Sequence, residues 1–94
     1  MPRAIWNGAI LAESDLCDEV EGNLYFPPES LDRRFFEPSP RTSVCGWKGT
    51  AEYFDLVVDG QRNAAAAWIY RDPKPAASSI RDRVAFWTGV TIER

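Results

Sequence analysis

The chain is 94 residues long, the size of one small domain, and 45% of its residues are hydrophobic, including five Phe, four Trp and three Tyr. A core of that composition needs neither disulfides nor metal. The net charge of −3 and pI near 4.8, without a stripe of basic residues, argue against a nucleic-acid binder. Histidine is absent, which excludes Ser-His-Asp and Cys-His catalysis and most catalytic zinc sites.

The first part of the chain predicts short strands joined by tight turns. Residues 5–11 form a hairpin pattern around Asn7-Gly8, the preferred pair for a two-residue turn. Residues 18–26 predict a strand pair or one bent strand, with Gly22-Asn23 as the turn signal. Pro27-Pro28 ends this β segment.

The next segment predicts helix and then extended chain. Residues 30–36 show one or two turns of helical spacing, and Glu29 or Ser30 is expected to cap their start. Pro38 and Pro40 then hold an extended stretch that leads towards residue 45.

The clearest strand of the chain is predicted over residues 50–58. Its alternation separates two faces. Asp59-Gly60 is a hairpin turn signal, and residues 64–70 are expected to return antiparallel. One face carries Phe54, Leu56 and Val58, and the other carries Tyr53, Asp55 and Val57.

The C-terminal part predicts a short helix over residues 76–83 with Ile80 inward, followed by one strand over residues 84–92. In total, six or seven short strands and one or two short helices predict a mainly β, antiparallel fold in a single domain, residues 1–94. The aromatic residues Trp6, Phe26, Phe86 and Trp87 are predicted to lie in the core. In the last strand, one face is expected to carry Val84, Phe86, Val90 and Ile92.

The cysteines and the absence of targeting signals indicate a cytoplasmic protein. No run of about 18 apolar residues is present, and the N-terminus has no charged-then-apolar signal, so no membrane association is expected. Cys17 and Cys45 are then reduced thiols, with a disulfide between them as the alternative. They form no CxxC pair, and the acids between Glu13 and Glu21 lack the spacing of a calcium loop. We therefore expect no metal and no cofactor.

The segment from Thr42 to Tyr53 has the densest set of reactive side chains. A thiol, an indole, an ammonium and a phenol lie within nine positions, carried by Cys45, Trp47, Lys48 and Tyr53. A core has no use for this combination, so the segment is predicted to line a site.

The chain carries, in this order, Trp6-Asn7-Gly8, Leu11–Ser14, Glu21–Pro27, Thr42, Cys45–Tyr53, Ala67–Tyr70, Asp72-Pro73, Ile80 and Val84–Trp87. This order resembles one bacterial family, the domain of unknown function 427 (DUF427), which also carries a nucleotidyltransferase-like label. The resemblance spans nearly the whole chain, and it implies a β-tent or Mss4-like architecture of two small antiparallel sheets over a cleft. The zinc site of Mss4-like relatives is not carried over, because their two CxxC pairs are missing. No motif for nucleotidyl transfer is present either.

Cys45 and Lys48 are the candidate catalytic residues. The thiolate of Cys45 is a nucleophile or redox group if a cation lowers its pKa, and a small buried core residue if not. Lys48 is an anion contact or activator, or else a surface lysine. The two side chains meet only if a bulge or turn at Gly46 or Gly49 breaks the strand alternation.

An aromatic pocket is expected around these two residues, since the faces of the predicted strands would converge there. The predicted ligand-binding residues are Tyr25, Trp47, Tyr53, Trp68 and Tyr70, with Glu13 at the edge. The sequence thus predicts a small-molecule-binding domain, with thiol chemistry on a small anionic or sulfur-containing ligand. The alternative is a non-catalytic protein-interaction module, and a homodimer through an edge strand is compatible with either.

Overall fold

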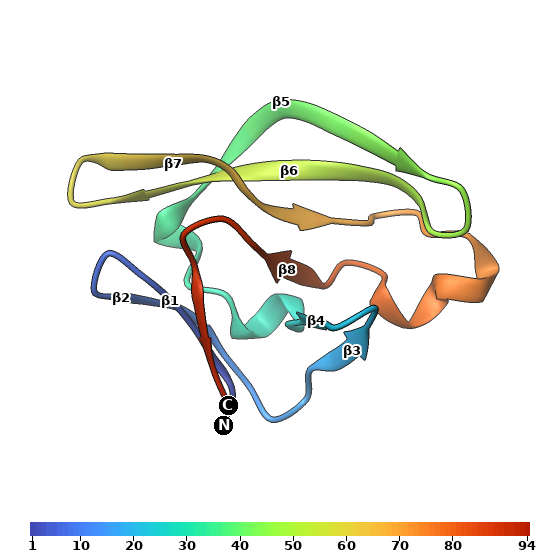
Figure 1. Ribbon diagram of the computed structural model, residues 1–94, viewed down its shortest axis with the longest axis horizontal. Helices are drawn as coiled ribbons and strands as arrows, with labels where there is room; N and C mark the ends of the chain where they lie inside the picture. The colour runs from blue at the N-terminus through green and yellow to red at the C-terminus, as the bar shows by residue number, and fades with distance from the viewer.

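The computed structural model describes residues 1–94 and is mainly β (Figure 1). Its strands form three antiparallel sheets, with the orders β2-β1-β9, β3-β4 and β5-β6-β7-β8. The strands are β1 Arg3–Trp6, β2 Ala9–Glu13, β3 Asp18–Val20, β4 Asn23–Tyr25, β5 Phe36–Cys45, β6 Gly49–Val58, β7 Gln61–Ile69, β8 Val84–Phe86 and β9 Thr91–Glu93. The helical segments are 3-10 turns: η1 Pro28–Ser30, η2 Arg33–Phe35 and η3 Pro75–Ile80.

The mainly β class is confirmed, and the strands divide among three sheets rather than two. The third sheet exists because β3 and β4 pair only with each other as strands, while Phe26, next along the chain, bridges to Val84 at the edge of the four-stranded sheet. No helix is long and apolar enough to cross a membrane.

The predicted hairpin turns are present. Asn7 and Gly8 have φ angles of 50° and 77°, and Asp59 and Gly60 have φ angles of 51° and 75°. These left-handed pairs match the twist of the flanking strands. The turn between β3 and β4 uses Glu21 and Gly22, one position earlier than predicted, because Asn23 already pairs with Val20.

Two predicted helices are instead short 3-10 turns. The predicted segment at 30–36 is split into η1 and η2, and the side chain of Asp32 accepts a hydrogen bond from the Arg34 amide at 3.3 Å. The predicted cap at Glu29 or Ser30 was therefore wrong, since η1 begins after Pro27 without a side-chain cap. In η3, Ile80 is fully buried, as predicted.

The predicted strand 84–92 is interrupted. Gly89, with a φ of 78°, lies in a turn in which the Val90 amide donates to the Trp87 carbonyl at 2.9 Å. The chain then leaves the large sheet, and β9 pairs with β1, which places the two termini side by side (Figure 1). Trp87 is not a core residue: it is 45% exposed.

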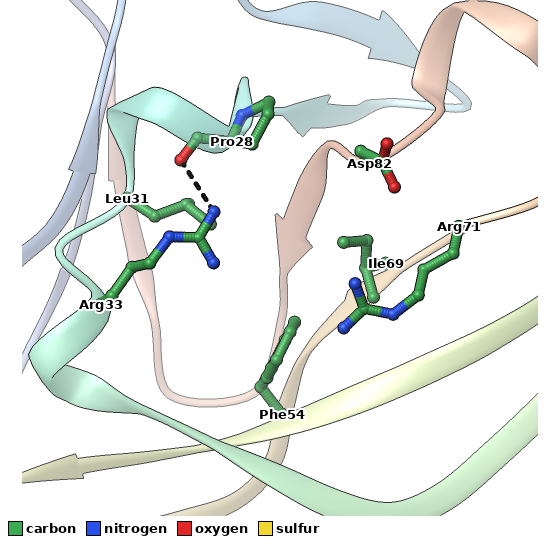
Figure 2. A pocket seen from close by; sticks show the side chains of 7 residues that line it. All are labelled: Pro28, Leu31, Arg33, Phe54, Ile69, Arg71 and Asp82. Atoms are coloured by element: carbon green, nitrogen blue, oxygen red, sulfur yellow. Dashed lines mark hydrogen bonds between the residues drawn. The ribbon is translucent and has the colours of Figure 1, made fainter.

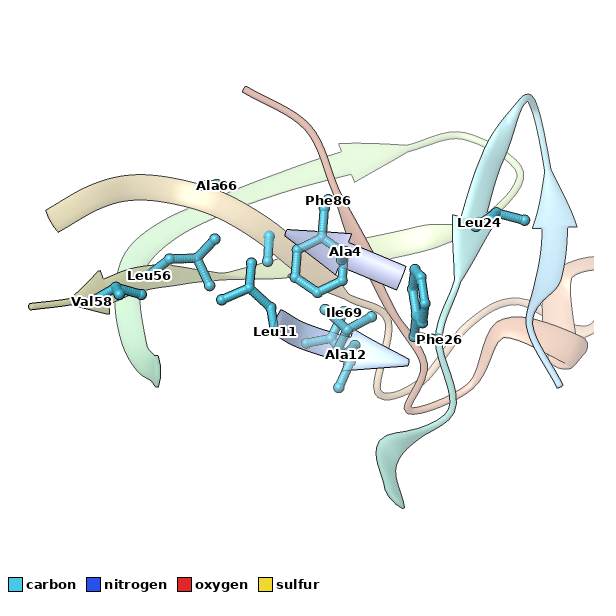
Figure 3. Packing of buried hydrophobic residues seen from close by; sticks show 12 residues of the cluster. Ala4, Leu11, Ala12, Leu24, Phe26, Leu56, Val58, Ala66, Ile69 and Phe86 are labelled. Atoms are coloured by element: carbon cyan, nitrogen blue, oxygen red, sulfur yellow. The ribbon is translucent and has the colours of Figure 1, made fainter. Parts of the chain in front are cut away.

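The main core lies between one face of the four-stranded sheet and the β1–β2 hairpin (Figure 3). Its largest fully buried residues include Phe26, Leu11 and Leu56. A second buried cluster contains Tyr25, Tyr70 and Ile80 and packs against Tyr53 and Trp68. Tyr53 and Trp68 are direct partners between β6 and β7, so they share a sheet face, while their neighbours Phe54 and Ile69 lie on the other.

Candidate functional site

Tyr25, Tyr53, Trp68 and Tyr70 do come together, and we call them the aromatic cluster. Trp68 packs between two tyrosines: its ring centroid is 6.3 Å from that of Tyr25 and 6.4 Å from that of Tyr53. The indole Nε1 of Trp68 donates a 3.1 Å hydrogen bond to the Tyr25 hydroxyl. β4 thus contributes Tyr25 to a face otherwise built by β6, β7 and the residue after β7.

Tyr70 is 4% exposed and packs with Tyr25 in the second buried cluster, beside Lys48. Burial raises the pKa of Tyr70, Lys48 opposes that rise, and Tyr25, Cys45 and Tyr53 add to it. The packing agrees with these influences, since Tyr70 shares a buried cluster with Tyr25 and packs near Tyr53, and the Lys48 ammonium lies 5.6 Å from the Tyr70 ring centroid. Because its pKa is raised, Tyr70 remains protonated at neutral pH and presents an O–H donor.

Lys48 is buried, with 8% of the residue exposed. Its ammonium donates to the carboxylate of Glu21, which also accepts from the indole Nε1 of Trp47 at 3.3 Å. The ammonium lies 5.6 Å from the ring centroids of both Trp47 and Tyr70. Burial lowers the pKa of Lys48, but the Glu21 hydrogen bond and the nearby tyrosines outweigh burial, so the pKa is raised overall. Lys48 is therefore a fixed positive charge.

The position of Lys48 follows from the turn between β5 and β6. Cys45 and Gly49 are paired across the two strands, so residues 46–48 form the connection and the strand alternation ends. Gly49 has a φ of 112°, and a Cβ at this position would lie 3.4 Å from the Asp72 carbonyl oxygen. The Lys48 carbonyl accepts from the Lys74 amide at 2.9 Å, which holds the turn against the chain before η3.

Cys45 is a partly buried free thiol at the end of β5, and Cys17 is free as well. No hydrogen bond joins Cys45 to Lys48, whose ammonium is bound to Glu21. The burial of Cys17 raises the pKa of its thiol, and its Sγ donates to the Ser14 carbonyl at 3.5 Å. Cys45 lies on the strand whose Ser43 contacts Tyr53, whereas Cys17 packs against the main core.

Two predicted residues lie outside the cluster itself. Trp47 is 40% exposed and contacts the site through Glu21 and Lys48. Glu13 is exposed at the end of β2, where its carboxylate lies 3.7 Å from Arg3, and no contact joins it to the tyrosines. No group of three or more His, Cys, Asp or Glu residues is arranged to hold a metal ion.

Sequence reasoning missed four neighbours of the cluster. The Ser43 hydroxyl lies 2.9 Å from the Tyr53 hydroxyl. The guanidinium of Arg41 lies over the rings of Tyr53 and Trp87, 4.8 and 5.3 Å from their centroids. The two-residue spacing from Arg41 to Ser43 to Cys45 was a usable signal, since alternate strand residues share a face. Glu21 and Trp87 had no such signal, because each reaches the site through a turn.

One cavity is present, of about 300 Å³, and it lies on the opposite face of the four-stranded sheet (Figure 2). Phe54 and Ile69 contribute to its wall, together with Arg33 and Arg71. None of the residues predicted for ligand binding lines it. The aromatic cluster is therefore a sheet face with polar groups and not an enclosed pocket.

These features define a small antiparallel β domain in which β4, the large sheet and the segments that flank its strands bring together three tyrosines, a buried lysine and a thiol. The chain belongs to the family described as "Domain of unknown function (DUF427)", whose profile matches residues 2–93. No curated protein matches the chain.

Proposed function

We propose that this domain binds a small anionic or sulfur-containing molecule on the aromatic cluster. One observation carries the proposal: the buried Lys48 ammonium lies 5.6 Å from the ring centroid of Tyr70, which packs with Tyr25 from a distant part of the chain. A protonated phenol beside an ammonium is a suitable contact for a carboxylate or sulfur oxyanion. The flanking rings supply apolar surface for the rest of the ligand.

Glu21 occupies the position that a ligand anion would take. Its carboxylate already accepts from Lys48 and from Trp47, and these two hydrogen bonds, Lys48 first, lower its pKa. Glu21 lies on an exposed hairpin turn, with 51% of its side chain exposed. An incoming anion that displaces Glu21 from Lys48 would gain the same two donors.

Any thiol-dependent step is assigned to Cys45, because it lies on β5 two residues after Ser43, whose hydroxyl contacts Tyr53. With no histidine in the chain, the proton acceptor would be a carboxylate, a tyrosine or a lysine. We place this chemistry in the reducing environment of the cytoplasm, in keeping with two free thiols.

Binding is tested by following the backbone and indole N–H signals of ¹⁵N-labelled protein during titrations with acetate, sulfite and thiosulfate. We expect saturable shifts at Trp47 and Trp68 for at least one of these anions. Tyr70→Phe and Lys48→Gln should weaken them, and Lys74→Gln is the matched control, since Lys74 is the other lysine and donates to the Gly46 carbonyl outside the cluster. Equal binding by all three variants, or no saturable shift at the indoles, would refute the proposal.

The role of Cys45 is tested by the pH dependence of its alkylation in the Cys17→Ser protein. Rapid labelling of folded protein, slowed by an anion that shifts the indole signals, supports a thiol in the binding site. Labelling that occurs only on unfolding assigns Cys45 to packing.

The second candidate function is a non-catalytic protein-interaction module. It is favoured by the exposure of Trp47 and Trp87, at 40% and 45%, since Trp47 lies beside Lys48 and Trp87 packs against Trp68. It is also favoured by Val44, which is 81% exposed on the edge strand β5. Self-association through β5 would give a homodimer, and sedimentation velocity over a range of concentrations measures it. If the protein stays monomeric at high concentration, the homodimer is excluded, and the partner of an interaction module would have to be a different protein.

A further inference from the structure

We infer that the cavity on the other sheet face is a second binding site, for a small organic anion with an apolar body. It is independent of the aromatic cluster, because β6 and β7 separate the two. The cavity lies between the sheet, the η1–η2 segment and the turn after η3 (Figure 2). Its features are an apolar wall, two guanidinium groups and one carboxylate at the rim.

The apolar wall consists of Phe54, Ile69 and Leu31. Phe54 and Leu31 are partly exposed, and Ile69 is 5% exposed. Pockets that bind small molecules are typically lined by such side chains with a few polar groups. A cavity of about 150 Å³ holds benzene in an engineered protein, so the volume of about 300 Å³ here has room for a ring and an attached anionic group.

The two guanidinium groups approach the cavity from opposite sides. Arg33 comes from η2 and Arg71 from the residues after β7, and Figure 2 shows both pointing into the space above Phe54. The Arg71 guanidinium lies 5.9 Å from the Phe54 ring centroid, and its Nε lies 3.3 Å from a Glu52 carboxylate oxygen. A planar anion between the two arginines would meet donors on both sides.

Arg33 lacks a carboxylate partner. It takes part in no ion pair, and its one hydrogen bond goes to the Pro28 carbonyl at 3.4 Å, near the limit of such a contact. Its sequence neighbour Arg34, in contrast, donates to Asp32 through both Nε, at 2.9 Å, and Nη2, at 2.6 Å. Of these two adjacent arginines, the one facing the cavity is the one left free for a ligand.

Asp82 sets the charge of the rim. It also makes no ion pair, and its amide donates to the Tyr70 carbonyl at 3.0 Å, which fixes the residue beside the cavity. Its φ is 61°, a conformation that asparagine adopts readily. Among the lining residues a ligand anion meets two positive groups and one negative group, and Glu52 already pairs with Arg71, so removal of the Asp82 charge should tighten binding.

The test is a ¹⁵N NMR titration with benzoate and phenyl phosphate, and benzyl alcohol serves as the neutral analogue. We expect saturable shifts at Phe54, Ile69 and Arg71 for one or both anions and much smaller ones for the alcohol. A preference between the two anions identifies the anionic group. The tryptophan indole signals report on the aromatic cluster, and the signals of Phe54, Ile69 and Arg71 report on the cavity. A failure of ligand binding at one site can therefore be recognised whatever happens at the other.

Four variants complete the test. Arg33→Gln and Arg71→Gln should each weaken anion binding about threefold to tenfold, the effect of losing one solvent-accessible charge contact. Arg34→Gln is the control and should bind as the wild type does. Asp82→Asn should bind more tightly. Equal loss in Arg34→Gln, tighter or unchanged binding in both cavity arginine variants, or equal affinity for benzyl alcohol would overturn the inference.

Discussion

The indole of Trp68 in β7 donates a 3.1 Å hydrogen bond to the hydroxyl of Tyr25 in β4, across 43 positions of sequence. Tyr25 is fully buried, and the two rings meet edge to face at 82°. This contact ties the small β3–β4 sheet to the large sheet. It also gives the hydroxyl of a buried tyrosine a partner, as buried polar groups require.

Tyr25→Phe should destabilise the protein by about 1–2 kcal/mol, because it leaves the Trp68 Nε1 donor without its acceptor. Urea unfolding monitored by tryptophan fluorescence measures the change. Trp68→Phe and the double variant complete a double-mutant cycle. The cycle separates the interaction energy of the Tyr25–Trp68 pair from the packing energy lost when Trp68 is replaced. Strictly additive losses would show that the hydrogen bond contributes nothing to stability.

Glu21→Gln should lower the pKa of Lys48. Burial lowers this pKa, and the Glu21 hydrogen bond is the largest of the opposing effects. NMR titration of the Lys48 side chain measures the change. Glu19→Gln is the control, since Glu19 is on the same hairpin but pairs with Arg94 at 3.2 Å. An unchanged Lys48 pKa in Glu21→Gln would mean that the nearby tyrosines alone keep this pKa raised.

Asp55 should make the stability of the protein depend on acid pH. Its Oδ1 accepts from the Ala65 amide and its Oδ2 from Arg62, both at 2.8 Å, and these contacts, the amide first, lower the pKa of Asp55. A carboxylate with a lowered folded-state pKa contributes its full stability above the unfolded value of about 3.9. That contribution is lost as pH falls through the lower folded-state pKa.

Asp55→Asn should therefore cost about 1–2 kcal/mol at pH 7 and progressively less below pH 4. Urea unfolding at a series of pH values gives the comparison. Glu37→Gln is the control: Glu37 also pairs with Arg62 at 2.8 Å, but it is half exposed, so its removal should change stability little. A cost for Asp55→Asn that stays constant between pH 7 and pH 3 would contradict the assignment.

Replacement by glycine should destabilise the protein less at Ala65 than at the neighbouring Ala66. Ala65 has a φ of 51° at the bulge where β7 shifts register against β6, whereas Ala66 is a fully buried alanine with no such angle. Both substitutions remove a buried methyl group, but only Ala65→Gly relieves the backbone strain of an alanine in the left-handed conformation. Ala65→Gly should therefore be less destabilising than Ala66→Gly by about 1–2 kcal/mol. Equal melting temperatures for the two variants would show that the bulge stores no strain.

Much of the fold was predictable because its signals are local. Asn7-Gly8 and Asp59-Gly60 specify left-handed turn pairs whatever surrounds them, and the alternation over residues 50–58 separates two sheet faces. The clustering of Tyr53, Trp68 and Tyr70 follows from that alternation and the hairpin register. Trp87 was misplaced because the interruption at Gly89 depends on pairing with β1 at the other end of the chain.

The sequence by itself determined the β class, the main hairpins and the aromatic character of one sheet face, since each depends on residues only a few positions apart. The tertiary structure alone decided that Lys48 meets Glu21, 27 positions away, and that Arg33 and Arg71 face one cavity on the opposite side of the sheet. Those contacts depend on how separate strands and turns pack together. Packing reflects the shape and charge of the whole chain, and no local pattern encodes it.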